Sequence, residues 1–315
     1  ILFLGSNYYL WLGMERIPGS ERYRGYVLAH PLRREIVATH VTNSMINRVG
    51  STFVHRMREE TGASVADVVR AYIATREAFG MVAFWQQVEA LDDRVADRIQ
   101  SEMLIASGRL VVRATLWFLR QRRHPAGLDA TLGRFRPGIG EVARLLPDAL
   151  SGDDAREFRA AAAKLVEAAV PEVLAAQTAG FDALFSALDI VEVAALAARG
   201  VETVARLAWT LGGRLELPWL RSRIATLPAD SHWHGLAKAA LRDDLAGLQR
   251  ALAHDALRGA SNGDDVARSI AEWEASHDVL LERCRHVLAG LRAADSLDLA
   301  MASVAMRELR NLVPR

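Results

Sequence analysis

The chain has 315 residues, of which 51% are hydrophobic and 24% charged, a composition typical of a globular protein with a substantial core. Its 39 basic and 38 acidic residues leave a net charge of +1, which excludes a strong overall attraction to nucleic acid or to an anionic membrane. Lys164 and Lys238 are the only lysines, so a mechanism that needs a catalytic lysine has two candidates.

The first fourteen residues are apolar, but they include no initiating methionine and no basic segment of a signal peptide. We therefore expect the chain to be a piece of a longer polypeptide. Only Ile1 to Leu4 resembles a β-strand. No apolar run reaches the roughly 18 residues of a membrane span. The single cysteine, Cys284, excludes an intrachain disulfide and favours the reducing cytoplasm.

The first strongly periodic segment runs from Pro31 to Gly50. Proline suits the first turn of a helix because its missing N–H needs no partner there, and glycine suits a helix end. The apolar side chains of this predicted helix form two strips, which consist of Leu32, Ile36 and Ile46 and of Val37, Val41 and Met45. A helix that is apolar on two sides is normally buried between partners, so we expect it to be enclosed.

Two asparagines, Asn43 and Asn47, share a face with Leu32, Ile36 and Ile46. A buried amide without a hydrogen bond costs about 1–3 kcal/mol, so each of these side chains needs a partner. The amides either tie down adjacent backbone or face a ligand or a neighbouring domain. The sequence leaves both interpretations open.

Ser64 and Asp67 have nearly the spacing of a capping box and predict the start of a second helix. A longer helix is predicted after Asp92 and Asp93, one of which is expected to cap it. Its apolar residues recur at spacings of three and four, at Val95, Ile99, Met103, Ala106, Leu110, Ala114 and Trp117.

Loop-forming residues cluster at 124–140, 150–154 and 258–265. Further helices are predicted over 154–179, 182–198, about 232–257 and from 265 to near the C-terminus. Strands and helices do not alternate, so a parallel α/β sheet is disfavoured. The predicted fold class is all-α, a multi-helix domain of long packed helices with no substantial β-sheet and a soft boundary near residues 124–140.

Asp92, Asp93 and Asp97 also suggest a metal site. They resemble the magnesium motif of all-α isoprenoid synthases, in which carboxylates hold Mg²⁺ against a diphosphate. The second metal motif of such enzymes is missing, because Asp264 and Asp265 are followed by partners at the wrong spacing. The simpler interpretation is that these carboxylates begin and cap the long helix.

The other short patterns have structural explanations. Residues 138–140, Gly-Ile-Gly, resemble a dinucleotide loop, but no strand precedes them, so a helix-start loop is favoured. Residues 232–234, His-Trp-His, and the pair Cys284 and His286 lack a zinc spacing, which favours surface or core histidines. Residues 120–123, Arg-Gln-Arg-Arg, indicate a solvated helix end, because no aromatic platform for nucleic acid accompanies them. No catalytic triad can be assigned from spacing alone.

Six segments carry long motifs in a fixed order. They are HPLRREIVATHVTNSMINRVGSTFVHRMREETGAS (30–64), REAFGMVAFWQQVEALDDRV (76–95), SEMLIASGRLVVRATLWFLRQRR (101–123), ALFSALDIVEVA (183–194), ALRDDLAGLQRAL (240–252) and MRELRNL (306–312). Together they resemble the C-terminal region of the large bacterial NAD-specific glutamate dehydrogenases. The resemblance covers residues 22–315, whereas residues 1–21 match poorly and form a leader or the tail of a preceding segment.

The resemblance implies that the whole enzyme oxidatively deaminates L-glutamate to 2-oxoglutarate and ammonia and reduces NAD. Catalysis in that family belongs to a central unit, and its nucleotide loop and catalytic lysine and aspartate have no matching motif here. We therefore carry over no catalytic, cofactor-binding or metal-binding residue. The segment is expected to be a C-terminal helical scaffold or regulatory domain of a cytoplasmic homo-oligomer.

The partner implied by the resemblance is the catalytic domain of the same polypeptide, with neither nucleic acid nor a membrane. We expect the helix from Pro31 to dock near that domain because it comes first in the chain. The candidate contact residues are Arg33, Arg34, Asn43 and Asn47.

Two other functions stay open from the residues themselves. One is a stand-alone helical interaction protein. The other is a magnesium-dependent all-α isoprenoid enzyme that uses Asp92, Asp93 and Asp97.

Overall fold

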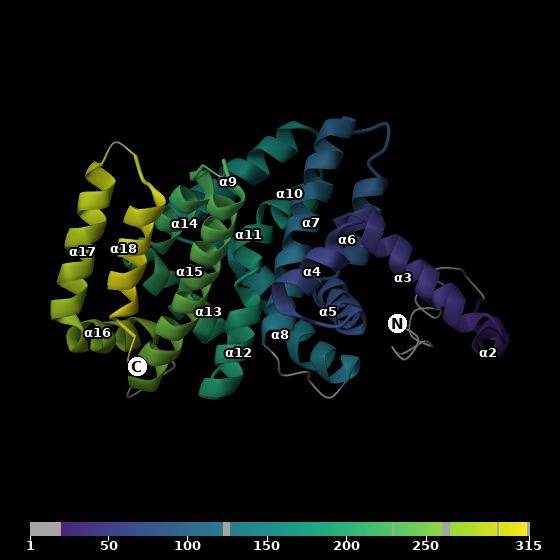
Figure 1. The fold of residues 1–315 in the computed structure, drawn as a ribbon, viewed down its shortest axis with the longest axis horizontal. Helices are drawn as coiled ribbons and strands as arrows, with labels where there is room; N and C mark the ends of the chain where they lie inside the picture. The colour runs from purple at the N-terminus through teal and green to yellow at the C-terminus, as the bar shows by residue number, and fades with distance from the viewer. Residues whose placement is uncertain (1–19, 122–126, 229, 260–264, 295, 314–315) are drawn as a thin grey trace. The chain divides into compact units, whose positions relative to one another are not determined.

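The structure is a computed structural model that describes residues 20–121, 127–228, 230–259, 265–294 and 296–313. Within these residues every regular element is a helix (Figure 1), which confirms the predicted all-α fold. The strand predicted at Ile1–Leu4 lies outside the described residues. None of the described helices combines the length and apolar composition that crossing a bilayer requires.

The chain divides into two compact units. Unit 1 comprises Ile1–Pro137 and Glu167–Leu174, and unit 2 comprises Gly138–Val166 and Ala175–Arg315. One division falls inside a continuous helix, α8 (Leu128–Ala149). The soft boundary near residues 124–140 and the separation of residues 1–21 from 22–315 both stay predictions.

Unit 1 contains most of the helices in the first half of the chain. They are the 3₁₀ helix η1 (Ser20–Tyr23), α2 (Arg24–Ala29), α3 (Arg33–Val49), α4 (Phe53–Thr61), α5 (Val65–Ala78), α6 (Met81–Glu89), α7 (Asp97–Arg120) and the first part of α8.

The core of unit 1 is built around the pair α5 and α7. α5 packs along α7, and α3, α4 and α6 also pack against α7. Residues 71–79 of α5 and the turn after it are buried, so the C-terminal half of this helix is enclosed on all sides. Phe53 of α4 meets Tyr72 edge to face, with ring centroids 6.0 Å apart. The helix start predicted at Ser64 is confirmed, because Ser64 Oγ accepts the N–H of Asp67 at 3.2 Å.

The apolar stripe of α7 is confirmed, whereas its predicted cap is wrong. The stripe residues Val95, Ile99, Met103, Leu110 and Ala114 are all buried. The N-cap is Ala96, which makes no side-chain cap hydrogen bond. Asp92 and Asp93 lie in the preceding turn, where Asp93 has a φ of 63°. Aspartate tolerates this left-handed conformation, so the pair forms the turn instead of capping the helix.

Unit 2 contains the rest of α8 and the helices after it. They are α9 (Gly152–Glu167), α10 (Glu172–Ala179), α11 (Phe181–Leu184), α12 (Ala187–Ala197), α13 (Val201–Arg214), α14 (Leu217–Thr226), α15 (His232–Gly259), α16 (Val266–Ser276), α17 (Asp278–Ala293) and α18 (Leu299–Arg310). The end of α9 and the start of α10 are assigned to unit 1.

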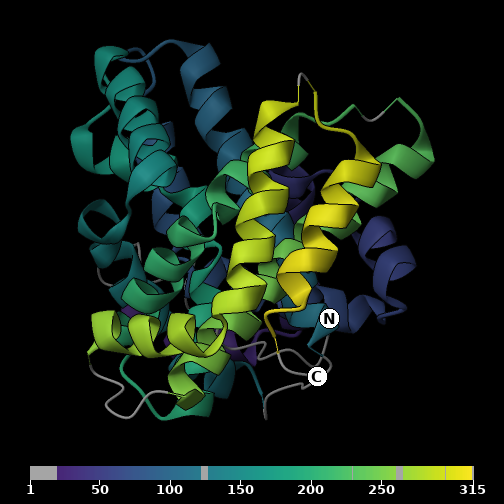
Figure 2. The same ribbon diagram turned by 90° about the vertical axis from the view of Figure 1, so that its left-hand side faces the viewer.

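α15 is the centre of unit 2. It packs against α12, α13, α14, α16 and α18. α17 and α18 lie side by side in both views (Figure 2) and pack on one another. The predicted helix starting at residue 265 is confirmed in position, because Asp265 caps α16 by accepting the N–H of Arg268 at 3.0 Å. The segment predicted as one helix from residue 265 to near the C-terminus consists of three helices, α16, α17 and α18.

The loop predicted over residues 124–140 is wrong from residue 128, where α8 begins. Gly138 lies inside this helix and faces Val191 of α12 so closely that any Cβ at position 138 would collide with its side chain. Glycine here permits close packing of two helices and makes no turn. The Gly-Ile-Gly pattern at 138–140 is therefore neither a dinucleotide loop nor a helix-start loop.

The helices predicted over 154–179 and 182–198 are each divided. The first breaks between α9 and α10, where Ala169 has a φ of 66° and Pro171 lacks an N–H to continue the helix. The second breaks between α11 and α12, where Ser186 Oγ donates to the Ala183 carbonyl at 2.6 Å. Such side-chain bonds compete with the helical pattern.

Candidate functional site

α3 carries the residues that the sequence marks as a candidate contact surface. The helix begins at Arg33, and Gly50 ends it with a φ of 89° that favours glycine. The predicted end is confirmed, whereas the predicted start at Pro31 is two residues early. His30 Nδ1 accepts the N–H of Leu32 at 3.1 Å, so a local turn precedes the helix.

One apolar strip of α3 belongs to the core of unit 1. Val37, Val41 and Met45 are 1–4% exposed, and the helix packs against α2, α4 and α7. This inner side of α3 therefore contributes to the stability of the unit by apolar burial.

A partly buried hydroxyl pair fixes the same side to α5. Ser44 Oγ and Tyr72 Oη lie 2.9 Å apart and form a hydrogen bond. Burial raises the pKa of Tyr72, and the hydrogen bond from Ser44 opposes that rise with a smaller effect. Tyr72 is thus a neutral structural partner of α3.

Arg48 anchors the C-terminal end of α3 to two other helices. Its guanidinium lies 4.8 Å from the centroid of the Trp85 ring and pairs with Glu89, both on α6. Its carbonyl oxygen approaches α7 so closely that a Cβ on Gly108 would lie only 3.0 Å away. The position of α3 therefore depends on a glycine in the middle of α7.

The second apolar strip is exposed. Leu32, Ile36 and Ile46 are 57%, 43% and 46% exposed. Asn43 and Asn47 are exposed beside them, and neither amide bonds to another residue that the structure describes. α3 is therefore enclosed on one side only, and the interpretation that the amides tie down adjacent backbone is wrong within this part of the chain.

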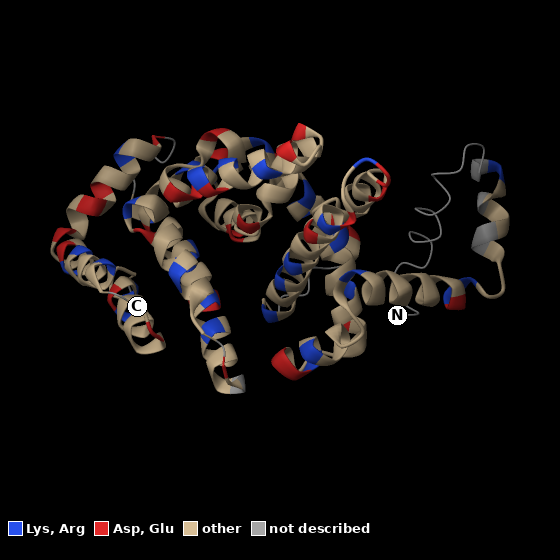
Figure 3. Ribbon diagram, turned by 90° about the horizontal axis from the view of Figure 1, so that it is seen from above, with Lys and Arg blue, Asp and Glu red and all other residues tan. Residues whose placement is uncertain are grey.

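The two arginines of the predicted contact lie at the start of the same helix. Arg33 is half-buried and already engaged within the chain, and Arg34 is exposed. Between Glu35 and Arg48 the helix carries no Lys, Arg, Asp or Glu, and Figure 3 shows it tan along most of its length. This exposed side suits a partner that is apolar and offers a few hydrogen-bonding groups.

α5 contains a buried ion pair that the sequence pattern did not predict. Arg76 and Glu77 are 3% and 6% exposed, and the guanidinium donates to Glu77 Oε1 at 2.7 and 2.9 Å. Nearby, Thr115 Oγ1 donates to Thr75 Oγ1 at 3.4 Å. In the sequence, Arg76 and Glu77 are two adjacent charged residues within a long apolar run. Adjacent side chains on a helix do not face each other, so their spacing did not predict an ion pair.

A second unforeseen cluster lies in unit 2. Trp273 Nε1 donates to Asp255 Oδ2 at 2.9 Å, and His277 stacks on the Trp273 ring at 4.6 Å. His277 Nε2 is 3.8 Å from the same carboxylate. These residues lie on or beside α15 and α16 and hold the two helices together, so the cluster is structural.

The sequence candidates for a metal site are not brought together. In the residues that the structure describes, no group of three His, Cys, Asp or Glu side chains is arranged to hold a metal ion. Asp92, Asp93 and Asp97 are exposed and belong to a turn and a helix start.

Cys284 is unsuited to nucleophilic or metal chemistry. It is 2% exposed, and its Sγ donates to the Glu308 carbonyl at 3.4 Å. Burial, with a smaller contribution from the charge of Glu308, raises the pKa of Cys284 to about 11, so the thiol is neutral.

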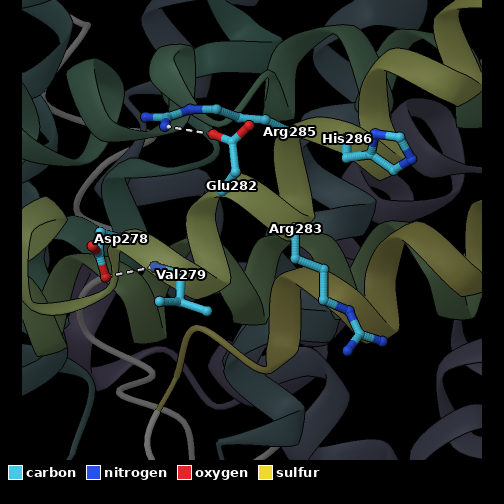
Figure 4. A pocket seen from close by; sticks show the side chains of 6 residues that line it. All are labelled: Asp278, Val279, Glu282, Arg283, Arg285 and His286. Atoms are coloured by element: carbon cyan, nitrogen blue, oxygen red, sulfur yellow. Dashed lines mark hydrogen bonds and ion pairs between the residues drawn. The ribbon is translucent and has the colours of Figure 1, made fainter.

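A shallow groove on α17 contains His286 (Figure 4). It is lined by Asp278, Val279, Glu282, Arg283, Arg285 and His286. Arg285 pairs with Glu282 at 3.7 Å, and Arg283 pairs with Glu308 at 2.7 Å. The labelled side chains point in different directions, so they do not converge on one ligand.

The remaining candidates are surface features where the structure describes them. His234 is exposed near the start of α15. Arg120 ends α7 and lies 4.0 Å from Glu60, whereas Arg122 and Arg123 lie outside the described residues. The geometry thus leaves the outer side of α3 as the candidate functional surface.

Comparison with known proteins gives a consistent result. A family model described as "Glutamate dehydrogenase, C-terminal" matches residues 18–311. The chain is 36% identical over 293 residues to an NAD-specific glutamate dehydrogenase from Pseudomonas aeruginosa and 34% identical over 293 residues to one from Halomonas elongata. It is 32% identical over 292 residues to one from Mycobacterium tuberculosis. Each match covers 93% of this chain and 18% of the relative, so the chain spans less than a fifth of these proteins.

Proposed function

The chain belongs to the family of glutamate dehydrogenase C-terminal regions, and from this premise we propose that it is a non-catalytic helical scaffold within a large NAD-specific glutamate dehydrogenase. The observation that carries the proposal is the match over nearly the whole chain to one segment of much longer enzymes. The exposed side of α3 supports it, because a scaffold needs a surface for its partner.

The whole enzyme would convert L-glutamate, water and NAD⁺ to 2-oxoglutarate, ammonium, NADH and a proton. The names of the relatives support this reaction. NAD would bind elsewhere in the polypeptide, and the whole enzyme would be a cytoplasmic homo-oligomer that binds neither nucleic acid nor a membrane.

The side chains of this chain support a non-catalytic role. A dehydrogenase site of the family type needs a lysine, and the chain offers two. Lys238 Nζ donates to the Leu227 carbonyl at 2.8 Å and thereby ties the end of α14 to α15. Lys164 is exposed on α9, on the solvated side of that helix.

Arg33, Arg34, Asn43 and Asn47 are our candidates for the contact with the catalytic domain of the same polypeptide. Arg34, Asn43 and Asn47 are exposed and therefore accessible to such a domain.

The test is a comparison of activities. The full-length source enzyme should produce NADH from L-glutamate, followed by absorbance, whereas residues 1–315 alone should produce none while showing a helical circular dichroism spectrum. A full-length enzyme without this activity would overturn the assigned reaction. Glutamate-dependent NADH production by the chain alone would overturn its non-catalytic role.

A further inference from the structure

We propose that the outer line of α3, defined as Leu32, Ile36, Asn43, Ile46 and Asn47, inserts into an apolar groove of the polypeptide that precedes this region in the full-length enzyme. This inference rests on the proposed function and identifies the partner of its candidate surface. It also changes the emphasis of that contact, because the aliphatic side chains carry it and the arginines at the helix start are peripheral.

The spacing of the outer line is that of a helix that binds in a groove. Its consecutive members are four, seven, three and one residues apart, and at 3.6 residues per turn all five positions lie within roughly 100° around the helix axis, so they share one side of the helix. At 1.5 Å per residue, the line from Leu32 to Asn47 is roughly 22 Å long. Helices recognised in this way present aliphatic anchors at such intervals to an apolar groove.

The inner side of α3 makes the outer line a rigid surface. Val41 and Met45 are buried, Ser44 bonds to Tyr72, and Arg48 is held by α6 and α7. A helix fixed in this way presents its exposed side chains without a further cost for ordering the backbone, which favours binding. Insertion of the outer line would therefore leave the core of unit 1 unchanged.

The two amides define the polar chemistry of the groove. An asparagine side chain offers two donors and an acceptor, and a peptide group offers the complementary pair. Asn43 and Asn47 are four residues apart on the half of the line that also carries Ile46. The groove should therefore be apolar where it meets Leu32 and Ile36, with open peptide groups where it meets the amides.

The length of the relatives, and the C-terminal position of the matched segment within them, indicate which polypeptide occupies the outer line. More than four-fifths of each relative lies outside the matched segment, and the matching family is a C-terminal one. α3 is the first long helix of the match. Just before it, Tyr26 is 80% exposed and Tyr23 48% exposed, so the accessible apolar surface extends toward the start of the matched region. The absence of Lys, Arg, Asp and Glu between Glu35 and Arg48 disfavours a highly charged partner.

The experiment measures whether the outer line is covered in the full-length enzyme. Ile46→Cys is compared with Ile105→Cys, which is 54% exposed on α7 and is a matched control in the same unit. Each variant reacts with a maleimide under native conditions, and mass spectrometry of the peptides gives the labelling rate. Cys284 does not interfere, because its thiol is buried and its pKa is about 11.

Ile46→Cys should label roughly tenfold or more slowly than Ile105→Cys, because only local opening would expose it, and both should label at equal rates in denaturant. Equal rates under native conditions would overturn the proposal. A photo-crosslinking residue at position 46 then identifies the occupant. Crosslinks to the polypeptide before this region support the proposal, whereas crosslinks to residues 1–19 or to a second copy of residues 20–313 overturn it. The readout needs no turnover, so it is independent of the reaction assigned to the whole enzyme.

Discussion

The inner side of α3, with Val37, Val41 and Met45, is 1–4% exposed, whereas the outer side, with Leu32, Ile36 and Ile46, is 43–57% exposed. Both sides carry three large apolar side chains on the same helix. The inner three are covered within unit 1, and no described residue covers the outer three to a similar degree. The difference indicates that the helix serves two surfaces, one that stabilises this domain and one that is available to a partner.

The polar residues of the two sides differ in the same way. On the inner side, Ser44 bonds to Tyr72 and Arg48 contacts Trp85 and Glu89. On the outer side, the amides bond to no residue in the described part of the chain. Polar groups on a packed surface need partners, whereas exposed ones can be solvated until a partner arrives.

The most direct way to break the comparison is to truncate adjacent residues on opposite sides. Met45→Ala should lower the free energy of unfolding by about 2–5 kcal/mol, because it leaves a cavity in the core. Ile46→Ala, one residue along, should change it by less than about 0.5 kcal/mol. Urea unfolding of residues 1–315 measures both values, and similar losses for the two variants would contradict the assignment of sides.

A glycine tests how closely the inner side is packed. Gly108→Ala should lower the free energy of unfolding by about 1–3 kcal/mol, because its Cβ would press on the Arg48 carbonyl. Gly133→Ala in α8 is the matched control, because its Cβ meets no atom within 4 Å. The control should raise the stability by about 0.5–1 kcal/mol through better helix propensity. The midpoint temperature of thermal unfolding should therefore fall for Gly108→Ala and rise for Gly133→Ala. A change in the same direction for both variants would refute the close approach of Gly108 to the Arg48 carbonyl.

Removing the hydroxyl pair on the inner side should have the smallest effect on the free energy of unfolding, and this effect should depend on pH. The pKa of Tyr72 is raised above 10.0 in the folded state. As pH rises past 10, tyrosine in the unfolded chain loses its proton first, so the stability from this group is complete below pH 10 and is lost above it. Tyr72→Phe should cost about 0.5–1.5 kcal/mol near pH 8 and should remove this part of the alkaline decline. The measurement is the urea concentration at the unfolding midpoint, taken between pH 8 and 11 for the unmodified chain and for Tyr72→Phe. An identical decline of this midpoint in the two proteins would contradict the prediction.

Local patterns explain which parts of the fold could be predicted. The cap at Ser64 and the cap at Asp265 each involve residues three positions apart, so the sequence contains the whole interaction. The stripe of α7 repeats at the helical period, which fixes both the helix and its buried side.

The errors arose where a residue serves a partner on another helix, or where a local turn takes residues that resemble a helix cap. Gly138 resembled a loop residue, but it is needed because Val191 of α12 lies against it. Asp92 and Asp93 resembled caps, but they form the turn before the helix. The contact between Trp273 and Asp255 joins residues from neighbouring helices, and no spacing rule could have paired them.

The candidate surface was predictable in part. The sequence identified α3, its two apolar strips and the amides Asn43 and Asn47, and the segment around them indicated the family. It could not distinguish the strip that this domain buries from the strip that it leaves exposed, because periodicity reports only that a side of a helix is apolar. Burial depends on which helices pack beside it.

By itself, the sequence determined the all-helical fold, most helix positions and membership of the glutamate dehydrogenase C-terminal family. The tertiary structure decided that Val37, Val41 and Met45 lie inside and that Leu32, Ile36 and Ile46 lie outside. The physical reason is that a helix forms through hydrogen bonds between residues close in the sequence, and its apolar periodicity can be read from the sequence. Which apolar side is buried depends on the packing of α2, α4 and α7 against α3.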